Sequence, residues 1–233
     1  MKIALLGYGK MGQTIERIAL ERGHEIVLKK DEFNTYEGLS NADVAIDFSI
    51  PAVAVDNISN CFYANVPVIS GTTGWLEHYD EMVALCKEKN GAFISSSNFS
   101  LGVNLFFGLN EYLAKMMSKF GSYSVEMEEI HHTQKLDAPS GTAISLAKGV
   151  IENSDYTNWT LEEAKENQIH IEAVRTENVP GTHTVTYNSE VDTIEIKHTA
   201  HNRDGFALGA VIAAEWIVGK HGIFTMKDVL ELK

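Results

Sequence analysis

A glycine-rich loop near the start of the chain constrains the fold more than any other feature. Residues 7–12 read Gly-Tyr-Gly-Lys-Met-Gly and fit the pattern G-x-G-x-x-G. The apolar run 3–6 before it predicts a buried strand, and Ile15 and Ile18 after it share one helical face, with Gly23 where a helix should end. This strand–loop–helix order predicts a dinucleotide-binding unit, because the glycines let the backbone and the helix N-terminus approach a pyrophosphate. A glycine-rich turn without a ligand is the alternative, which the strand–helix context disfavours.

The first hundred residues continue the same alternation. Short β-rich runs occur at 26–28, 44–48, 68–70 and 93–95, and residues 79–86 carry a helical apolar face. Strands that alternate with helices indicate right-handed βαβ units and a parallel sheet.

The pattern changes from about residue 122. Longer stretches there alternate polar and apolar residues: 123–130, 169–174, 182–187 and 191–198. Such alternation is typical of a mixed or antiparallel sheet with one face toward water or toward a partner.

The end of the chain returns to an apolar helix at 206–218, which we expect to be buried against the first domain. The sequence therefore predicts an α/β protein of two domains. Residues 1–101 and 205–233 would form a Rossmann-type dinucleotide-binding domain with a parallel sheet. Residues 102–204 would form an α+β domain with a mixed sheet, for substrate binding and oligomerisation.

Charge and composition limit the kinds of binding partner and the cellular location that we expect. The net charge of −13 disfavours nucleic acid, and no run of about 18 apolar residues predicts a membrane span. The apolar start of the chain is too short for a signal peptide. Cys61 and Cys86 have neither metal-ligand spacing nor the density of a disulfide framework, so we expect a cytoplasmic protein.

Polar residues at three strand ends extend the expected dinucleotide site. Asp31 lies 19 residues beyond Gly12, where an acid that binds the ribose hydroxyls is expected. Lys29 and Lys30 beside it could meet a 2′-phosphate or be solvated, which leaves the choice between NADH and NADPH open. The runs Ser-Gly-Thr-Thr-Gly at 70–74 and Ser-Ser-Asn-Phe at 96–99 also follow strands, and together the three loops outline one crevice.

The densest chemistry lies in residues 129–142, Glu-Ile-His-His-Thr-Gln-Lys-Leu-Asp-Ala-Pro-Ser-Gly-Thr. Adjacent histidines on a strand point to opposite sides, so we expect no metal site. An imidazole at His131 with Lys135 four residues later suits proton transfer and anion binding. Ser140 predicts a helix N-cap, whose free N–H groups suit a carboxylate. A capped helix behind an exposed basic loop is the structural alternative.

This run closely resembles the signature of the 4-hydroxy-tetrahydrodipicolinate (dihydrodipicolinate) reductase family. The resemblance covers the whole chain in order, including the glycine loop, Asp-Phe-Ser at 47–49, Gly-Thr-Thr at 71–73, Ser-Asn-Phe-Ser at 97–100 and the helix at 203–214.

The resemblance implies NADH- or NADPH-dependent reduction of a cyclic dicarboxylate, 4-hydroxy-tetrahydrodipicolinate, to tetrahydrodipicolinate with loss of water, on the diaminopimelate route to lysine. It implies a homotetramer, a number that the sheet pattern alone leaves open against a monomer. His131 would be the catalytic proton donor or acceptor and Lys135 the second donor. The implied substrate contacts are His132, Gly141 and Thr142. The implied cofactor contacts are Gly7, Tyr8, Gly9, Lys10, Met11, Gly12, Asp31, Gly71, Thr72, Thr73, Ser96, Ser97, Asn98 and Phe99.

Three departures bear on cofactor preference rather than on the reaction. The glycine loop is one residue shorter than in the longest members, Ile50 replaces the family's arginine, and Glu32 rather than a basic residue follows Asp31. Two rival functions remain: an aspartate- or homoserine-dehydrogenase-like reductase, and a non-catalytic redox sensor. The combination of His131, Lys135 and the Ser-Gly-Thr run disfavours both.

Overall fold

The computed structural model describes residues 1–232, which form two compact units. The first comprises Met1–Leu101 and the chain from Asp204 onward, and the second comprises Gly102–Arg203. Each is described separately below. Within residues 1–232, every helix falls short of the length and apolarity that crossing a bilayer requires.

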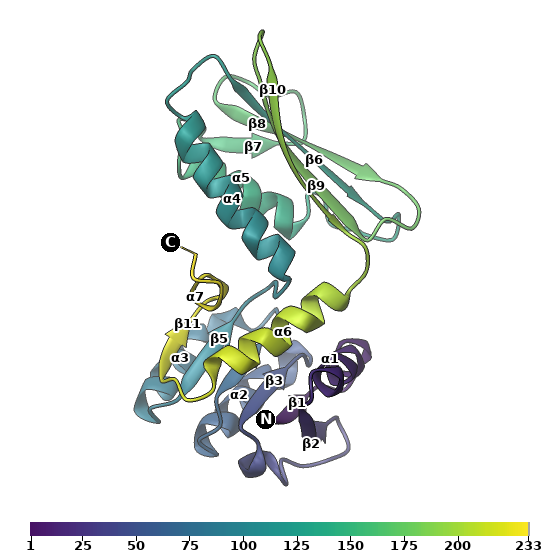
Figure 1. The fold of residues 1–233 in the computed structure, drawn as a ribbon, viewed down its shortest axis with the longest axis vertical. Helices are drawn as coiled ribbons and strands as arrows, with labels where there is room; N and C mark the ends of the chain where they lie inside the picture. The colour runs from purple at the N-terminus through teal and green to yellow at the C-terminus, as the bar shows by residue number, and fades with distance from the viewer. Residues whose placement is uncertain (233) are drawn as a thin grey trace. The chain divides into compact units, whose positions relative to one another are not determined.

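The first unit is built on a six-stranded parallel sheet of order β11-β5-β4-β3-β1-β2 (Figure 1). Its strands are β1 (Lys2–Leu6), β2 (Glu25–Lys30), β3 (Val44–Asp47), β4 (Val68–Ser70), β5 (Ala92–Ser95) and β11 (Gly222–Phe224). Its helices are α1 (Lys10–Glu21), α2 (Pro51–Tyr63), α3 (Tyr79–Glu88), α6 (Asp204–Ile217) and α7 (Met226–Val229), with 3-10 turns η1 (Leu39–Asn41) and η2 (Leu76–His78). The chain order reverses between β3 and β1, which is the position where doubly wound sheets bind ligands.

Helices cover both faces of this sheet, so alternate residues of its strands belong to two separate hydrophobic cores. Ile3 and Leu5 of β1 pack with α1, α6 and α7. Ala4 and Leu6 pack on the opposite side with α2 and α3. Strands buried on both faces read as continuous apolar runs, which is why β1 and β3 are recognisable in the sequence.

Helix α6 lies against the backbone that follows β5. A side chain at Gly209 would place its Cβ 1.7 Å from the carbonyl oxygen of Phe99, so only glycine permits this approach. Ala210, Ala213 and Ala214 of the same helix are completely buried. The predicted apolar helix therefore belongs to the core of the first unit.

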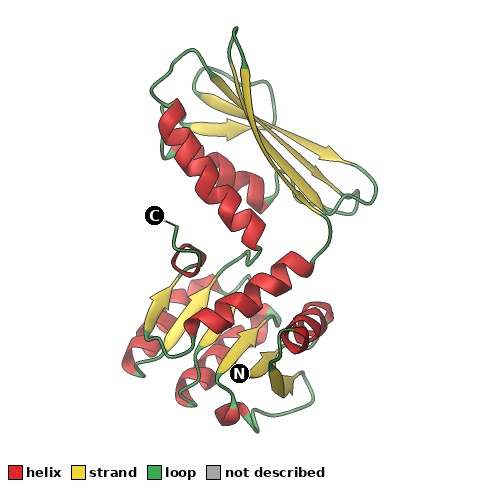
Figure 2. Cartoon of the chain, viewed as in Figure 1, coloured by secondary structure: helices red, strands yellow, loops and turns green. Residues whose placement is uncertain are grey.

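The second unit is a five-stranded mixed sheet of order β10-β9-β6-β8-β7. The strands are β6 (Ser124–His131), β7 (Asn158–Thr160), β8 (Gln168–Arg175), β9 (Gly181–Asn188) and β10 (Thr193–Ala200). Two helices, α4 (Leu101–Met117) and α5 (Gly141–Ile151), cover one face of this sheet (Figure 2). Val125, Met127 and Val185 belong to the core between the sheet and these helices. The predicted fold class, an α/β protein with a parallel and a mixed sheet, is therefore confirmed.

Several details differ from the sequence prediction. The last long strand begins at Thr193 rather than at 191, and Val191 is exposed in the turn before it. Helices α2 and α4 were not predicted. The opposite face of the second sheet is also less open than its threonines suggest, because Thr182 and Thr184 on β9 are buried.

Candidate active site

The glycine loop has the conformation that its pattern predicts. Gly7 has φ +97°, and a Cβ there would lie 2.2 Å from the carbonyl oxygen of Phe48. A Cβ at Gly12 would lie 2.3 Å from the carbonyl oxygen of Gly7. A Cβ at Gly9 would meet nothing within 4 Å, and this N-cap residue gives α1 no side-chain cap. The loop therefore leaves space and free N–H groups at the start of α1, which suits a dinucleotide pyrophosphate.

The lysines at the end of β2 already have partners within the first unit. Lys29 Nζ lies 2.6 Å from Glu16 Oε1 and 4.9 Å from the centre of the Tyr8 ring. The Tyr8 hydroxyl also donates to Glu16. The hydrogen bond from Lys29 lowers the pKa of Glu16. Lys30 Nζ donates to the carbonyl oxygen of Asp31 at 2.7 Å.

Asp31 itself is exposed at the end of β2. Its Oδ1 accepts from the Phe33 amide at 2.8 Å, and its own amide donates to Asn34 Oδ1 at 3.0 Å. These bonds fix a turn that presents the carboxylate at the strand end. Ile50, which replaces the family's arginine, is exposed at the N-cap of α2.

A buried carboxylate organises the ends of β3 and β4. Asp47 accepts hydrogen bonds from Ser49 Oγ (2.6 Å), Ser70 Oγ (2.7 Å) and Asn57 Nδ2 (2.9 Å). Burial raises the pKa of Asp47 despite these bonds. Thr72 Oγ1 accepts from the Ser49 amide at 2.8 Å. The predicted contact loop at 70–74 and the loop that follows β3 are therefore held by one internal network.

The loop at 70–74 also depends on a close approach, since a Cβ at Gly71 would lie 2.3 Å from the Phe48 ring. In the loop after β5, Ser96 Oγ donates to the Asn98 carbonyl oxygen at 2.8 Å. Phe99 is buried and packs against Phe48, with ring centres 5.8 Å apart. A contact of Phe99 with a cofactor would therefore have to use its backbone.

In the second unit, three neighbouring strands bring four ionisable side chains together. Glu129 and His131 lie two residues apart on β6 and share a face. His131 is the register partner of Arg175 on β8, and Glu129 is the register partner of His183 on β9. We refer to these four residues as the β6 cluster.

Glu129 is completely buried at the centre of the β6 cluster. Its Oε1 lies 3.1 Å from Arg175 Nη2, and its Oε2 lies 3.2 Å from His131 Nδ1. The Ser140 amide donates to Oε2 at 3.0 Å. Burial acts to raise the pKa of Glu129, but the contacts with His131, Ser140 and Arg175 outweigh it and lower the pKa to about 2. The carboxylate is therefore ionised at neutral pH.

His183 completes the β6 cluster as a neutral imidazole. Burial, followed by the charge of His131, lowers its pKa to about 4. Its Nε2 lies 2.9 Å from Ser140 Oγ, and its ring meets that of His131 edge-on with centres 5.0 Å apart.

The N-terminus of α5 adjoins this cluster through Ser140. The Ser140 side chain caps the helix by accepting from the Ala143 amide at 3.1 Å, as predicted. A Cβ at Gly141 would meet nothing within 4 Å, and Thr142 is half-buried. The helix start is therefore open where a carboxylate contact was predicted.

The loop between β6 and α5 carries the predicted lysine. Lys135 Nζ donates to both carboxylate oxygens of Asp137 at 2.8 Å, and this bond lowers the pKa of Asp137. Arg175 joins this loop to the β6 cluster, because its Nη2 also donates to the Asp137 carbonyl oxygen at 2.6 Å. His132 Nδ1 is buried and has no hydrogen-bond partner among residues 1–232.

Three donor groups of the cluster are close enough for a metal ion. The donor atoms of Glu129, His131 and His183 lie within 4.8 Å of one another. The adjacent pair His131 and His132 is not this group. Both oxygens of Glu129 are already engaged, one of them by the cation of Arg175, which disfavours a metal ion at this position.

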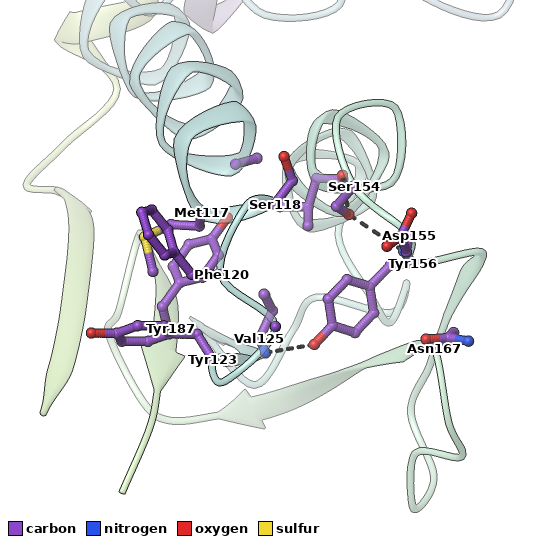
Figure 3. A pocket seen from close by; sticks show the side chains of 13 residues that line it. Met117, Ser118, Phe120, Tyr123, Val125, Ser154, Asp155, Tyr156, Asn167 and Tyr187 are labelled. Atoms are coloured by element: carbon purple, nitrogen blue, oxygen red, sulfur yellow. Dashed lines mark hydrogen bonds between the residues drawn. The ribbon is translucent and has the colours of Figure 1, made fainter. Parts of the chain in front are cut away.

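A separate pocket of about 170 Å³ in the second unit contains none of these groups (Figure 3). Met117, Phe120 and Tyr156 line it, and the Val125 amide donates to the Tyr156 hydroxyl at 2.9 Å. The pocket does not coincide with any residue predicted to act in the reaction.

Comparison with known proteins identifies the family. Residues 1–99 match the family described as "Dihydrodipicolinate reductase, N-terminus", and residues 102–230 match "Dihydrodipicolinate reductase, C-terminus". The chain is 59% identical over 233 residues to the 4-hydroxy-tetrahydrodipicolinate reductase of Christiangramia forsetii, covering 99% of this chain and 98% of that protein. The chain belongs to the dihydrodipicolinate reductase family. The resemblance inferred from the sequence is confirmed.

The enzyme is therefore an oxidoreductase that uses NADH or NADPH to reduce 4-hydroxy-tetrahydrodipicolinate, on the diaminopimelate route to lysine. A second reductase of this name, from Methanoregula boonei, is 34% identical, covering 100% of this chain and 98% of that protein. The dipicolinate-bound reductase from Paenisporosarcina sp. TG-14 has the same fold, with a TM-score of 0.76 over 97% of each chain at 22% identity.

Three members of the β6 cluster were missed as functional residues by sequence reasoning. Glu129 could have been found, because a residue two positions before His131 on a strand shares its face. Arg175 and His183 could not, since only the strand register brings them to β6.

Proposed function

We propose that His131 and Lys135 handle the protons of the reductase reaction, while His132, Gly141 and Thr142 hold a carboxylate of the substrate. The observation that carries this proposal is the position of His131 in a buried ionic cluster that is bonded directly to the N-cap of α5. A proton-exchanging group and an open helix N-terminus are thus joined through Ser140.

The reaction needs a hydride donor, an acid and groups that orient the substrate. After water has left the hydroxylated ring, the substrate is a conjugated imine dicarboxylate. The cofactor supplies a hydride, and the enamine that results must be protonated by an acid. An imidazole and an ammonium group can both act as that acid near neutral pH. The cations and the helix start orient the two carboxylates through charge-assisted hydrogen bonds.

In the first unit, each part of the cofactor can be assigned to particular residues. We assign the pyrophosphate to the open space at Gly9 and the uncapped start of α1. The carboxylate of Asp31 would accept from ribose hydroxyls. The complete proposed set is Gly7, Tyr8, Gly9, Lys10, Met11, Gly12, Asp31, Gly71, Thr72, Thr73, Ser96, Ser97, Asn98 and Phe99. Since Glu16 already pairs Lys29, a 2′-phosphate would have to compete with Glu16 for that lysine.

Three finer features are part of the proposal. The substrate is a small dicarboxylate, in line with the dipicolinate named for the Paenisporosarcina protein. The enzyme is a homotetramer that associates through the second unit. It works in the cytoplasm, which agrees with two buried free thiols at Cys61 and Cys86.

Replacement of His131 by glutamine tests the proposal. We expect kcat to fall about 10²- to 10⁴-fold, the usual range for loss of a general acid, with NADH affinity unchanged. Near-native turnover of His131→Gln would exclude the assignment.

A further inference from the structure

Glu129 is completely buried, yet it contacts residues on three segments that carry or adjoin the proposed site in the second unit. One oxygen contacts His131 and the Ser140 amide, and the other contacts Arg175. His131 lies at the end of β6, Ser140 caps α5, and Arg175 holds the loop that carries Lys135. A single carboxylate thus joins three separate segments of chain.

An ionised carboxylate at this depth is stable only with charged partners and well-placed hydrogen bonds. The ionisable groups that act on His183 are His131 and Glu129 on β6, His198 on β10 and Lys135 in the loop after β6. His183 is neutral near pH 7, because burial and the charge of His131 disfavour its cation. Arg175 is therefore the cation of the β6 cluster that pairs with Glu129, and His131 Nδ1 is the other ionisable contact of this carboxylate.

The two nitrogens of the His131 ring have different surroundings. Nδ1 is buried and lies 3.2 Å from Glu129 Oε2 in an ion-pair contact, and it has no hydrogen-bond partner among residues 1–232. Nε2 borders Gly181, where even a Cβ would come within 3.1 Å of it. The absence of a side chain at Gly181 keeps this nitrogen uncrowded. A carboxylate at Nδ1 fixes the neutral ring with its proton on Nδ1 and so leaves Nε2 to exchange protons.

The other oxygen of Glu129 acts on the lysine loop through Arg175. The guanidinium Nη2 contacts Glu129 at 3.1 Å and the Asp137 carbonyl oxygen at 2.6 Å, and Nε donates to the Lys135 carbonyl oxygen at 3.4 Å. The guanidinium therefore fixes the backbone on both sides of residue 136. Its own orientation is set by the carboxylate behind it.

We propose that Glu129 is the positioning residue of this active site: it orients His131 through Nδ1 and anchors the Lys135 loop through Arg175. The proposal rests on the proposed role of His131 as a catalytic acid. It assigns Glu129 no contact with substrate or cofactor.

The test compares Glu129→Gln with Glu163→Gln, which removes the same charge from an exposed loop of the same unit. For Glu129→Gln we expect kcat to fall about 10- to 100-fold, the usual effect of losing a partner that orients a histidine, while NADH affinity stays unchanged. Glu163→Gln should match the wild type in both measurements.

Two results would overturn the proposal. One is a wild-type kcat in Glu129→Gln while His131→Gln is inactive; activity in His131→Gln would instead refute the proposed function. The other does not depend on the folding of any Glu129 variant. The ¹⁵N shifts of the wild-type imidazoles, with the His131 signal assigned by its loss in His131→Gln, should report the neutral His131 ring protonated on Nδ1. Protonation on Nε2 would refute the positioning role.

Discussion

The ammonium group of Lys135 is held by both carboxylate oxygens of Asp137, at 2.8 Å each. Asp137 is largely exposed, with 61% of its side chain accessible, so the pair adds little to stability. If Lys135 acts as proposed, we therefore expect a substrate carboxylate to displace Asp137 at small cost.

Replacement of Lys135 by alanine should lower kcat/KM about 10²- to 10⁴-fold, through loss of a proton donor and a charge contact. NADH affinity and thermal stability should not change. The matched control is Lys148→Ala, which removes an exposed lysine from α5. Steady-state kinetics and NADH titration check this prediction, and near-native turnover of Lys135→Ala would show that the lysine has been misassigned.

Alanine substitutions at three glycines in open space can distinguish loss of a ligand contact from disturbed packing. A Cβ at Gly9, Gly141 or Gly121 would meet nothing within 4 Å, so alanine should be tolerated by the fold at each. We expect Gly9→Ala to weaken NADH binding about 10-fold or more by filling the pyrophosphate space. Gly141→Ala should instead raise the substrate KM, and Gly121→Ala should change neither.

Calorimetric Tm values and the two binding constants measure these effects. Equal effects of Gly9→Ala and Gly121→Ala on NADH binding would contradict the assignment of the glycine loop.

Stability should fall on acidification because of His183. Its pKa is lowered to about 4 in the folded protein, whereas an exposed histidine titrates near 6.5. Between these values the unfolded chain binds the extra proton, so unfolding becomes more favourable as the pH falls. The loss should be on the order of 2 kcal/mol between about pH 7 and about pH 5. Below about pH 4.5, protonation of Glu129 adds to the loss, because its folded pKa of about 2 lies below its unfolded value.

Urea unfolding of His183→Gln at the same two pH values checks this account. The variant should lose most of the pH dependence, whereas His78→Gln, at an exposed histidine on the surface, should retain it. An undiminished fall in stability in His183→Gln would place the titrating group elsewhere.

The apolar pattern determined which parts of the fold were predictable. The strand at 68–70 was predicted with its observed bounds, because buried parallel strands are short apolar runs between turn residues. Helix α4 was missed even though Phe106 and Leu113 are buried, since exposed Leu105, Leu109 and Tyr112 obscure its amphipathic pattern. Its apolar residues occur on both faces.

The residues of the candidate site also differ in how well the sequence predicts them. His131 and Ser140 belong to one continuous segment, so a sequence motif contains both. Arg175 and His183 reach the β6 cluster only through strand pairing across long sequence separations. Register is set by the whole sheet rather than by local residues, and no short-range signal in the chain reports it.

The proposed homotetramer predicts a particle of four times 25.8 kDa in solution. The supporting observation is the second sheet, whose helices α4 and α5 cover one face only. The other face is only partly exposed, since Thr182 and Thr184 are buried there, and its exposed part favours association. Light scattering at micromolar concentration measures the mass. A mass near 25.8 kDa would refute association, and twice that mass would leave the sheet face in place but correct the number.

The most direct test of the account is a steady-state assay with enzymatically generated 4-hydroxy-tetrahydrodipicolinate, run separately with NADH and NADPH. We predict cofactor oxidation that requires this substrate and that pyridine-2,6-dicarboxylate inhibits competitively, since it carries both carboxylates on a flat ring. Inhibition should weaken at high salt, because charge-assisted contacts dominate recognition. Oxidation that is independent of the substrate, or no inhibition at millimolar pyridine-2,6-dicarboxylate, would contradict it.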